Sequence, residues 1–95
     1  MKVKFKLFAS LKKGSGVVEV EFEGKKLREA LEELFKIYPE LKVVVEGGKI
    51  KEFYKIFVNG RDVEYLKGLE TELRDGDEVA IFPPIAGGLS SSSNI

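Results

Sequence analysis

The sequence predicts a small α+β domain in which a single helix covers one face of a sheet. Three observations favour this class. Short segments near both ends of the chain alternate between apolar and polar residues, as strands do when one face is buried. One segment carries apolar residues at helical spacing. The chain has 95 residues, which is the size of one domain with one core.

The first two strands are predicted at residues 2–8 and 17–23. Apolar residues alternate with lysines in the first segment and with glutamates in the second. Residues 12–16 between them include two glycines and predict a turn. We therefore expect an antiparallel hairpin whose outer face sets a lysine row opposite a glutamate row. The inner face would carry Val3, Phe5, Leu7, Val18, Val20 and Phe22.

The helix is predicted from one apolar stripe at steps of three and four residues. The stripe consists of Leu27, Ala30, Leu31, Leu34, Phe35 and Tyr38. Pro39 disfavours helical backbone at Tyr38 and should end the helix there. Gly24 is the best candidate for the N-cap, and Glu32 with Lys36 should form a favourable pair four residues apart.

The next segment, residues 40–52, has no clear periodicity. Residues 43–45 are all valine and suggest a short extended piece, which Gly47-Gly48 would end. Residues 53–58 then predict another strand. Its two faces would carry Tyr54, Ile56 and Val58 on one side and Phe53 and Phe57 on the other.

The last third of the chain predicts two further strands. Asn59-Gly60 is a strong hairpin signal, and residues 61–63 would form a brief return strand. After a turn at residues 75–77, residues 78–82 predict the last strand, which Pro83-Pro84 would end. The expected order is β-β-α-β-β-β, with hairpins on either side of one helix.

Composition excludes several classes of function. The 16 basic and 16 acidic side chains balance, so there is little electrostatic drive towards nucleic acid. The chain has no cysteine and no histidine, which removes the thiol nucleophile, the commonest general base and the commonest zinc ligand. No apolar run is long enough to span a membrane, and lysines interrupt the N-terminal apolar residues. We expect a cytoplasmic protein that is not an enzyme by itself and binds no metal or cofactor.

The chemistry-bearing part is expected near the C-terminus. The last predicted strand leads to Pro83-Pro84, then to Ile85, Ala86 and the diglycine Gly87-Gly88. Proline stiffens the direction of exit, and glycine has no Cβ, so such a tail can lie extended in a narrow channel of another protein. A carboxylate is unreactive towards nucleophiles, so it would first need conversion to a mixed anhydride, for example with AMP.

Four segments in this order resemble the MoaD/ThiS family of sulfur carriers, most closely its molybdopterin synthase small subunits. They are Phe8-Ala9-Ser10-Leu11, Val58-Asn59-Gly60-Arg61, residues 73–84 (LRDGDEVAIFPP) and Ala86-Gly87-Gly88. The resemblance covers residues 1–88, which we expect to form one domain. It implies a ubiquitin-like β-grasp fold, with a mixed sheet of about five strands packed against one main helix.

The resemblance also implies a reaction cycle carried out by partners. A ubiquitin-activator-like (MoeB-like) enzyme would use ATP to adenylate the Gly88 carboxylate, next to Gly87, and a sulfur donor would convert it to a thiocarboxylate. The carrier would insert its tail into the large, MoaE-like synthase subunit. There the sulfur would pass to a pterin precursor and build the dithiolene that binds molybdenum or tungsten. In this scheme the chain is the non-catalytic small subunit.

The sequence departs from the family at its end. Family members end at the second glycine, whereas residues 89–95 follow Gly88 here, and four of them are consecutive serines. We expect a flexible extension. It is either removed by a protease, or is a cloning remnant, or marks a copy that is inactive as a carrier.

A partner surface is expected beside the tail. Phe8 breaks the inward alternation, so it should lie on the opposite sheet face, near Phe82 if the first and last strands are neighbours as in a β-grasp fold. With Pro84, Ile85 and Ala86, these residues would form an apolar interface, the alternative being ordinary packing at the end of the strands.

Other readings remain open. The segment 61–78, with seven acidic and three basic residues, is either a solvated loop or an acidic surface that steers a basic partner. The fold could also serve thiamine synthesis or another sulfur pathway, or a ubiquitin-like modifier joined to lysines through Gly88, or a binding module whose tail has no role.

Overall fold

The computed structural model describes residues 1–7 and 16–84. The elements in chain order are β1 (Lys2–Leu7), β2 (Val17–Glu21), α1 (Leu27–Ile37), the 3₁₀ helix η2 (Pro39–Val44), β3 (Val45–Glu46), β4 (Lys49–Ile50), β5 (Lys55–Val58), β6 (Arg61–Asp62), the 3₁₀ helices η3 (Val63–Tyr65) and η4 (Gly68–Glu70), and β7 (Glu78–Phe82). In the described part of the chain no helix combines the length and the apolar character needed to cross a bilayer.

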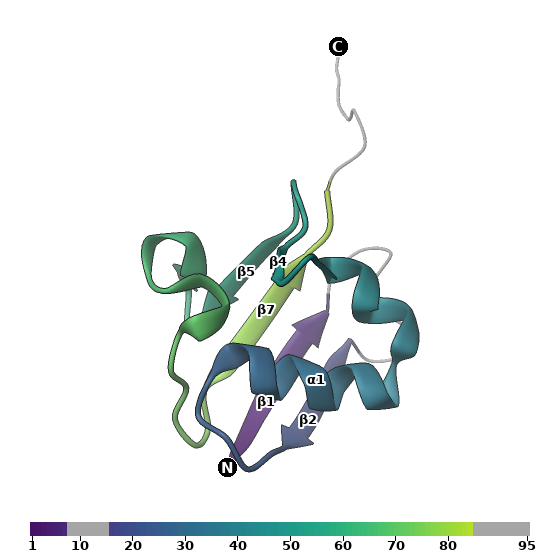
Figure 1. Ribbon diagram of the computed structural model, residues 1–95. Helices are drawn as coiled ribbons and strands as arrows, with labels where there is room; N and C mark the ends of the chain where they lie inside the picture. The colour runs from purple at the N-terminus through teal and green to yellow at the C-terminus, as the bar shows by residue number, and fades with distance from the viewer. Residues whose placement is uncertain (8–15, 85–95) are drawn as a thin grey trace.

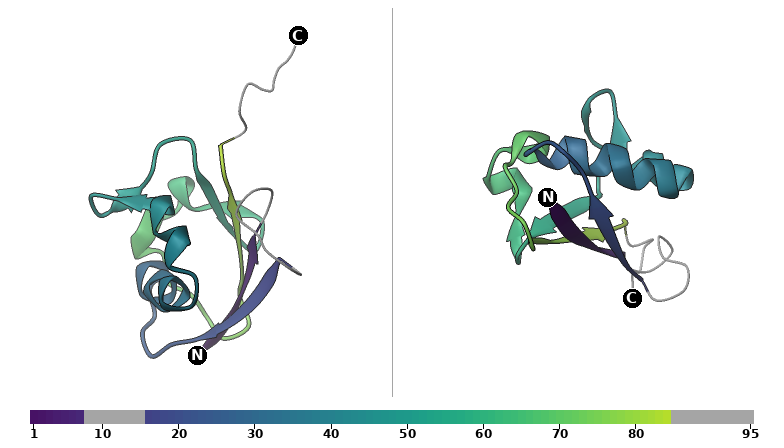
Figure 2. Two further views of the ribbon diagram at one scale, coloured as in Figure 1. Left: turned by 90° about the vertical axis from the view of Figure 1, so that its right-hand side faces the viewer. Right: turned by 90° about the horizontal axis from the view of Figure 1, so that it is seen from below.

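Five strands form one mixed sheet in the order β2-β1-β7-β5-β6, while β3 and β4 pair separately. The central strand β7 runs parallel to β1 and antiparallel to β5. α1 and η2 lie on one side of this sheet (Figures 1 and 2). The expected two-layer architecture and the neighbouring first and last strands are confirmed.

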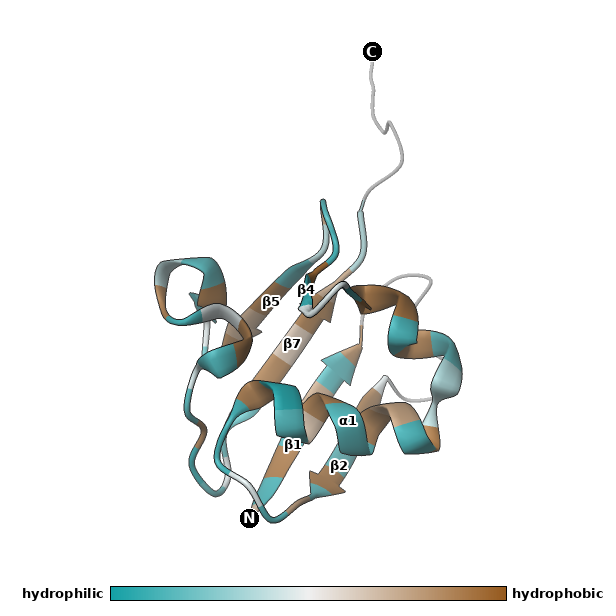
Figure 3. Cartoon of the chain, in the orientation of Figure 1, coloured by the Kyte–Doolittle hydropathy of each residue, from teal (hydrophilic) through white to brown (hydrophobic). Residues whose placement is uncertain are grey.

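The first hairpin has the predicted register. Lys2 faces Glu21, and Lys4 faces Glu19 across the strands, which confirms the opposed charge rows. Lys6 instead faces Val17 and makes its ion pair on the other side, with Glu78 of β7 at 3.1 Å. Apolar and polar residues alternate along β1, as the brown and teal bands of Figure 3 show.

The core lies between the sheet and the helical layer. Inward residues of the strands pack against the apolar stripe of α1, and burial of each large apolar side chain contributes about 1.5–3 kcal/mol. Phe35, Tyr38 and Val18, which were predicted as inward residues, are only partly buried at the margin of this core. The buried apolar residues are Val3, Phe5, Leu7, Val20, Phe22, Leu27, Ala30, Leu31, Leu34, Leu41, Val44, Ile56, Val58, Val63, Leu73, Val79 and Ile81.

The start of α1 differs from the prediction. Its N-cap is Lys26 rather than Gly24. The carboxylate of Glu29 turns back and accepts hydrogen bonds from the backbone N–H groups of Lys25 and Lys26, both at 2.9 Å. Gly24 has a different role, because a Cβ at this position would collide with the Glu29 carboxylate. A side chain at position 24 would therefore force the Glu29 carboxylate to shift from its capping position.

The ion pair on α1 also differs. Lys36 Nζ contacts Glu33 Oε2 at 2.9 Å, three residues away, rather than Glu32 as predicted. Positions three and four residues apart are both neighbours on a helix, so either glutamate is within reach of the lysine. The hydrogen bond that Lys36 donates to Glu33 raises the pKa of Lys36, and the Glu32 charge adds to this effect.

The extended piece predicted at residues 43–45 is wrong for its first two residues. They end the 3₁₀ helix η2, which buries Leu41 and Val44 because residues three apart share one side of such a helix. Only Val45 begins the short strand β3. Gly47 and Gly48 form the turn to β4 with φ of 61° and 78°.

The later strands are shorter than predicted. β5 begins at Lys55, so Phe53 and Tyr54 precede it. Asn59 and Gly60 have φ of 50° and 85°, as a two-residue hairpin turn requires, and they lead to a return strand of two residues. β7 has the predicted bounds.

Candidate functional site

The root of the C-terminal tail is held on both sides by the sheet. In β7, Ile81 pairs with Leu7 of β1, and Phe82 pairs with Lys55 of β5. Pro83 and Pro84 follow directly, and a proline has no N–H with which to continue a ladder. β7 therefore delivers the chain to a fixed point at one end of the central strand (Figure 1).

Several predicted site residues lie outside the described residues. They are Phe8, Ile85, Ala86, Gly87 and Gly88, and their roles stay predictions. Covalent geometry nevertheless limits where Gly88 can be. It is four residues beyond Pro84, and each residue spans at most about 3.3–3.6 Å, so it lies within about 14 Å of Pro84.

An open hollow of about 670 Å³ adjoins this point, and we call it the tail-root groove. It lies on the sheet face away from α1, because Ile56 and Ile81, the strand neighbours of its lining residues, point into the core. The groove is mostly apolar. Its lining residues are Phe53, Lys55, Phe57, Phe82, Pro83 and Pro84.

The two described members of the predicted partner surface both line the groove. Phe82 is half-buried and Pro84 is exposed. The rings of Phe82 and Phe57 meet edge to face, with centroids 5.4 Å apart and planes at 88°. This geometry suits the aromatic quadrupoles and fixes the direction of both rings. The floor of the groove is therefore held in place before any partner binds.

The structure adds Phe53, Lys55 and Phe57 to the site. The alternation in the sequence placed Phe53 and Phe57 together on the face opposite Ile56 but did not link these residues to the tail. The missing information was the pairing of β5 with β7, which brings that face to the root of the tail. Alternation within a strand gives the face of each residue but not the neighbouring strand.

A small charge cluster forms the rim of the groove. Lys55 Nζ lies 3.1 Å from Glu64 Oε1 and 3.8 Å from Asp62 Oδ2. The hydrogen bond to Glu64 raises the pKa of Lys55, and the Asp62 charge acts in the same direction. The rim thus carries a lysine that is already paired within the chain, beside an apolar floor.

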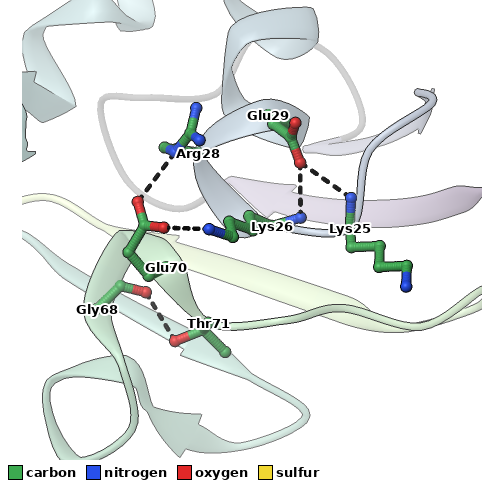
Figure 4. Close-up of polar contacts among 7 residues, drawn as sticks. All are labelled: Lys25, Lys26, Arg28, Glu29, Gly68, Glu70 and Thr71. Carbon is green, nitrogen blue, oxygen red and sulfur yellow. Dashed lines mark hydrogen bonds and ion pairs between the residues drawn. The ribbon is translucent and has the colours of Figure 1, made fainter.

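The acidic segment 61–78 is largely paired within the molecule. Glu70 illustrates this, with its two carboxylate oxygens 2.7 Å from Lys26 Nζ and 2.9 Å from Arg28 Nε (Figure 4). These contacts, with Lys26 as the larger cause, lower the pKa of Glu70. Glu78 pairs with Lys6 in the same way. The pairing favours a structural role for this segment over a surface that steers a basic partner.

Residues 1–7 and 16–84 contain no group of three His, Cys, Asp or Glu side chains placed to hold a metal ion. The tail-root groove is therefore the feature of the described chain that best fits a contact with another molecule, because it is open, apolar and adjacent to the predicted acceptor.

Comparisons with known proteins identify the family of the chain. The profile of the ThiS family matches residues 5–88. A candidate sulfur carrier protein of Archaeoglobus fulgidus is 38% identical over 94 residues, covering 93% of this chain and 100% of the relative. The molybdopterin synthase sulfur carrier subunit of Chlamydomonas reinhardtii is 34% identical over 92 residues, with coverage of 93% and 100%.

Among solved structures, the small archaeal modifier protein 1 of Methanosarcina acetivorans is similar over 92% of this chain and 96% of its own. The TM-score is 0.78 and the sequence identity is 36%. Together with the five-stranded mixed sheet and its main helix, this match confirms the expected ubiquitin-like β-grasp fold.

Proposed function

Because this chain belongs to the ThiS/MoaD family of small sulfur carriers, we propose that it carries sulfur as a thiocarboxylate on Gly88. We propose further that the sulfur serves the synthesis of a molybdenum- or tungsten-binding pterin cofactor. One observation carries the proposal: the central strand β7 leads to Pro83 and Pro84 in the wall of an apolar groove. Chain length limits the distance from Pro84 to Gly88 to at most about 14 Å.

The chemistry on the tail has three balanced steps. A Gly88 carboxylate oxygen attacks the α-phosphorus of ATP, pyrophosphate leaves, and an acyl adenylate forms. A hydrosulfide ion released by the sulfur donor then attacks the acyl carbon, AMP leaves, and a thiocarboxylate remains. Finally the thiocarboxylate sulfur attacks an electrophilic carbon of the pterin precursor and displaces an oxygen leaving group from it; hydrolysis of the acyl–sulfur bond then restores the carboxylate and leaves the sulfur on the pterin. Partner proteins supply ATP, sulfur and the general acids and bases.

The chain itself contributes presentation rather than catalysis. It has no cysteine or histidine to act as nucleophile or general base near neutral pH. Its sheet fixes the direction of exit, and the glycines give the acyl end a width that fits a narrow channel. The chain thus acts as the non-catalytic subunit of a synthase-type complex. A similar role is named in the Chlamydomonas reinhardtii relative, a sulfur carrier subunit of molybdopterin synthase.

The partner surface in this proposal is the tail-root groove. A protein that binds the tail up to Gly88 must also cover Pro84, and Phe82 is two residues before it. A partner that covers the apolar floor removes this surface from water, and each Å² of apolar area buried contributes about 25 cal/mol of favourable free energy. The groove therefore adds affinity that the side-chain-poor tail cannot supply.

The residues after Gly88 set a condition on this function. While Leu89 follows, the Gly88 carbonyl is part of a peptide bond and no carboxylate is available. We propose that the chain ending at Gly88 is the active form and that hydrolysis of the Gly88–Leu89 bond produces it.

Protein modification is the second candidate function. It is favoured by the similarity to small archaeal modifier protein 1, at 36% identity. The same acyl adenylate would then be attacked by a lysine amine of a target protein, which gives an isopeptide bond instead of a thiocarboxylate. Sulfur delivery to another pathway, such as thiamine synthesis, would use the same group on Gly88.

Intact-mass spectrometry of the chain purified from its native host separates these functions. A chain that ends at Gly88 with one oxygen replaced by sulfur supports sulfur carriage. Isopeptide-linked remnants of the chain's C-terminus on lysines of other proteins support modification; tryptic cleavage after Arg74 would leave residues 75–88 on the target lysine. A chain that always retains Ile95 contradicts both. Incubation of the thiocarboxylate form with the large synthase subunit and the pterin precursor then tests the role in pterin-cofactor synthesis. This role requires that a dithiolene product forms.

A further inference from the structure

The backbone at Phe53 has a conformation that a bulky residue rarely adopts. Its φ is 72°, and it is the third residue of a turn closed by a hydrogen bond from Tyr54 N–H to Lys51 O at 3.1 Å. A positive φ at this place is normally filled by glycine or asparagine, because a Cβ is crowded there. Local backbone preference therefore does not explain a phenylalanine at position 53.

Among the other described non-glycine residues, only Asn59 has a positive φ. Its case is different, because asparagine tolerates this conformation and Asn59-Gly60 is a favourable hairpin turn. Phe53 is thus the one bulky residue with a positive φ in residues 1–7 and 16–84.

Burial does not explain Phe53 either. Its side chain is 71% exposed and lines the tail-root groove together with Phe82 and Pro84. A side chain that stays in contact with water gains little stability from being apolar, and a polar residue would be equally suitable at this position. When an unfavourable backbone carries an exposed aromatic side chain, the observed strain points to a function at that residue.

We propose that Phe53 is a docking anchor for the enzyme that adenylates the Gly88 carboxyl, and that it enters an apolar pocket on that enzyme. The inference rests on the proposed function. The occupant follows from chain length: the enzyme's reacting groups act at Gly88, within about 14 Å of Pro84, and Pro84 is a wall of the same groove. Because Pro84 and Phe53 line the same groove, an enzyme that holds the tail back to Pro84 also reaches Phe53.

The anchor is distinct from the rest of the groove. Phe57 and Phe82 hold each other edge to face within the sheet, whereas Phe53 lies in the turn before β5. Exposed aromatic side chains beside such a fixed floor are typical of the few residues that dominate an interface. Phe53 would thereby help to determine which activating enzyme accepts this carrier.

ATP–pyrophosphate exchange by the adenylating enzyme of the same organism tests this proposal, with the chain ending at Gly88 as substrate. We expect Phe53→Asn and Phe53→Gly each to raise the KM for the carrier about tenfold or more, with little change in kcat. Phe53→Tyr keeps the aromatic ring and should stay near the wild-type KM.

The stability readout separates docking from folding. Asparagine and glycine both accept a positive φ, so Phe53→Asn and Phe53→Gly should unfold at a Tm equal to or above that of the wild type. The matched control is Ile37→Gln, which removes a 52% exposed apolar side chain from α1 on the other side of the sheet and should leave KM unchanged.

Two results would overturn the anchor. One is an unchanged KM for both Phe53→Asn and Phe53→Gly while the wild-type chain is adenylated normally. The other is a rise in KM that accompanies a comparable fall in Tm, because this would make Phe53 a structural residue. If the wild-type chain ending at Gly88 supports no exchange at all, the proposed function fails together with the anchor.

Discussion

The side chain of Asn59 clamps the turn that precedes the last strand. Its Nδ2 donates a hydrogen bond to Asp77 Oδ1 at 2.9 Å, and its Oδ1 accepts one from the backbone N–H of Glu78 at 3.0 Å. The backbone N–H of Asn59 also donates to Glu78 O at 2.8 Å. Two segments that are distant in the sequence, 58–61 and 73–84, are thus joined at the start of the strand that leads to the tail.

We predict that Asn59→Gly lowers the free energy of unfolding by about 1 kcal/mol, because it removes two exposed side-chain hydrogen bonds. Glycine keeps the positive φ, so backbone strain does not contribute to the change. Urea denaturation measures the effect. Asn59→Asp is the companion variant, since it places a second carboxylate beside Asp77 and should be more destabilising than Asn59→Gly. Equal stability of Asn59→Gly and the wild type would show that the clamp contributes nothing.

The capping carboxylate of Glu29 should make stability depend on pH. The hydrogen bonds from the backbone N–H groups of Lys26 and Lys25 lower its pKa below the ordinary value of 4.5. A lowered pKa in the folded state means that the stabilisation is present above about pH 4.5 and is lost as the pH falls through the folded-state value. Glu70, whose pKa is also lowered, adds to the loss in the same window.

We therefore expect the stability advantage of the wild type over Glu29→Gln to shrink between neutral pH and pH 3. Glutamine can still accept the capping hydrogen bonds but carries no charge. Thermal unfolding across this pH range is the measurement, with Glu32→Gln on the same helix as the control. A difference between wild type and Glu29→Gln that stays constant with pH would contradict the assignment of the charge.

Phe82→Asp should weaken binding to the tail-binding partner by tenfold or more, while it costs only about 1–2 kcal/mol of stability through the lost ring contact with Phe57. The neighbouring Ile81→Asp is the contrasting variant. Ile81 is fully buried, so an unpaired charge there should prevent folding. Titration calorimetry against the large synthase subunit, with circular dichroism for folding, separates the two outcomes. Unfolding of Phe82→Asp would make Phe82 a core residue instead.

The parts of the fold that follow from local periodicity could be predicted from the sequence. β1, β2 and β7 alternate, and the stripe of α1 is regular, so the face of each residue follows directly from its position. The 3₁₀ helix η2 was missed because three consecutive valines resemble a strand. In the structure Val44 is buried and Val43 is exposed, and this difference is not visible in the sequence. The N-cap was missed because Lys26 has no side-chain acceptor, and Glu29 fills this role from within the helix.

Only the site residues that are close to the diglycine in the sequence were predicted. Phe82 ends the last strand and Pro84 lies between that strand and the diglycine, so they belong to the segment that the diglycine itself singles out. Phe57 and Lys55 reach the same groove through the pairing of β5 with β7, a long-range contact that periodicity does not encode. No pattern in the sequence points to Phe53, because its role depends on a positive φ and the presence of a phenylalanine does not predict a positive φ.

Gly87 and Gly88 should be dispensable for folding and required for sulfur acceptance. Both follow the last strand, so we expect deletion of the pair, or Gly88→Ala, to leave the Tm within about 1 °C of the wild type. Either change should abolish adenylate-dependent sulfur loading, because the acyl end no longer fits the channel of the activating enzyme. Full loading of either variant would count against the proposed acceptor.

The most direct measurement is sulfur loading of the purified chain ending at Gly88 by its adenylating enzyme, ATP and a sulfur donor, followed by tandem mass spectrometry. We expect one sulfur in place of one oxygen, located at the C-terminal carboxyl of Gly88 and dependent on ATP. Sulfur at any other residue, or no sulfur on a chain that the enzyme demonstrably adenylates, would contradict this expectation.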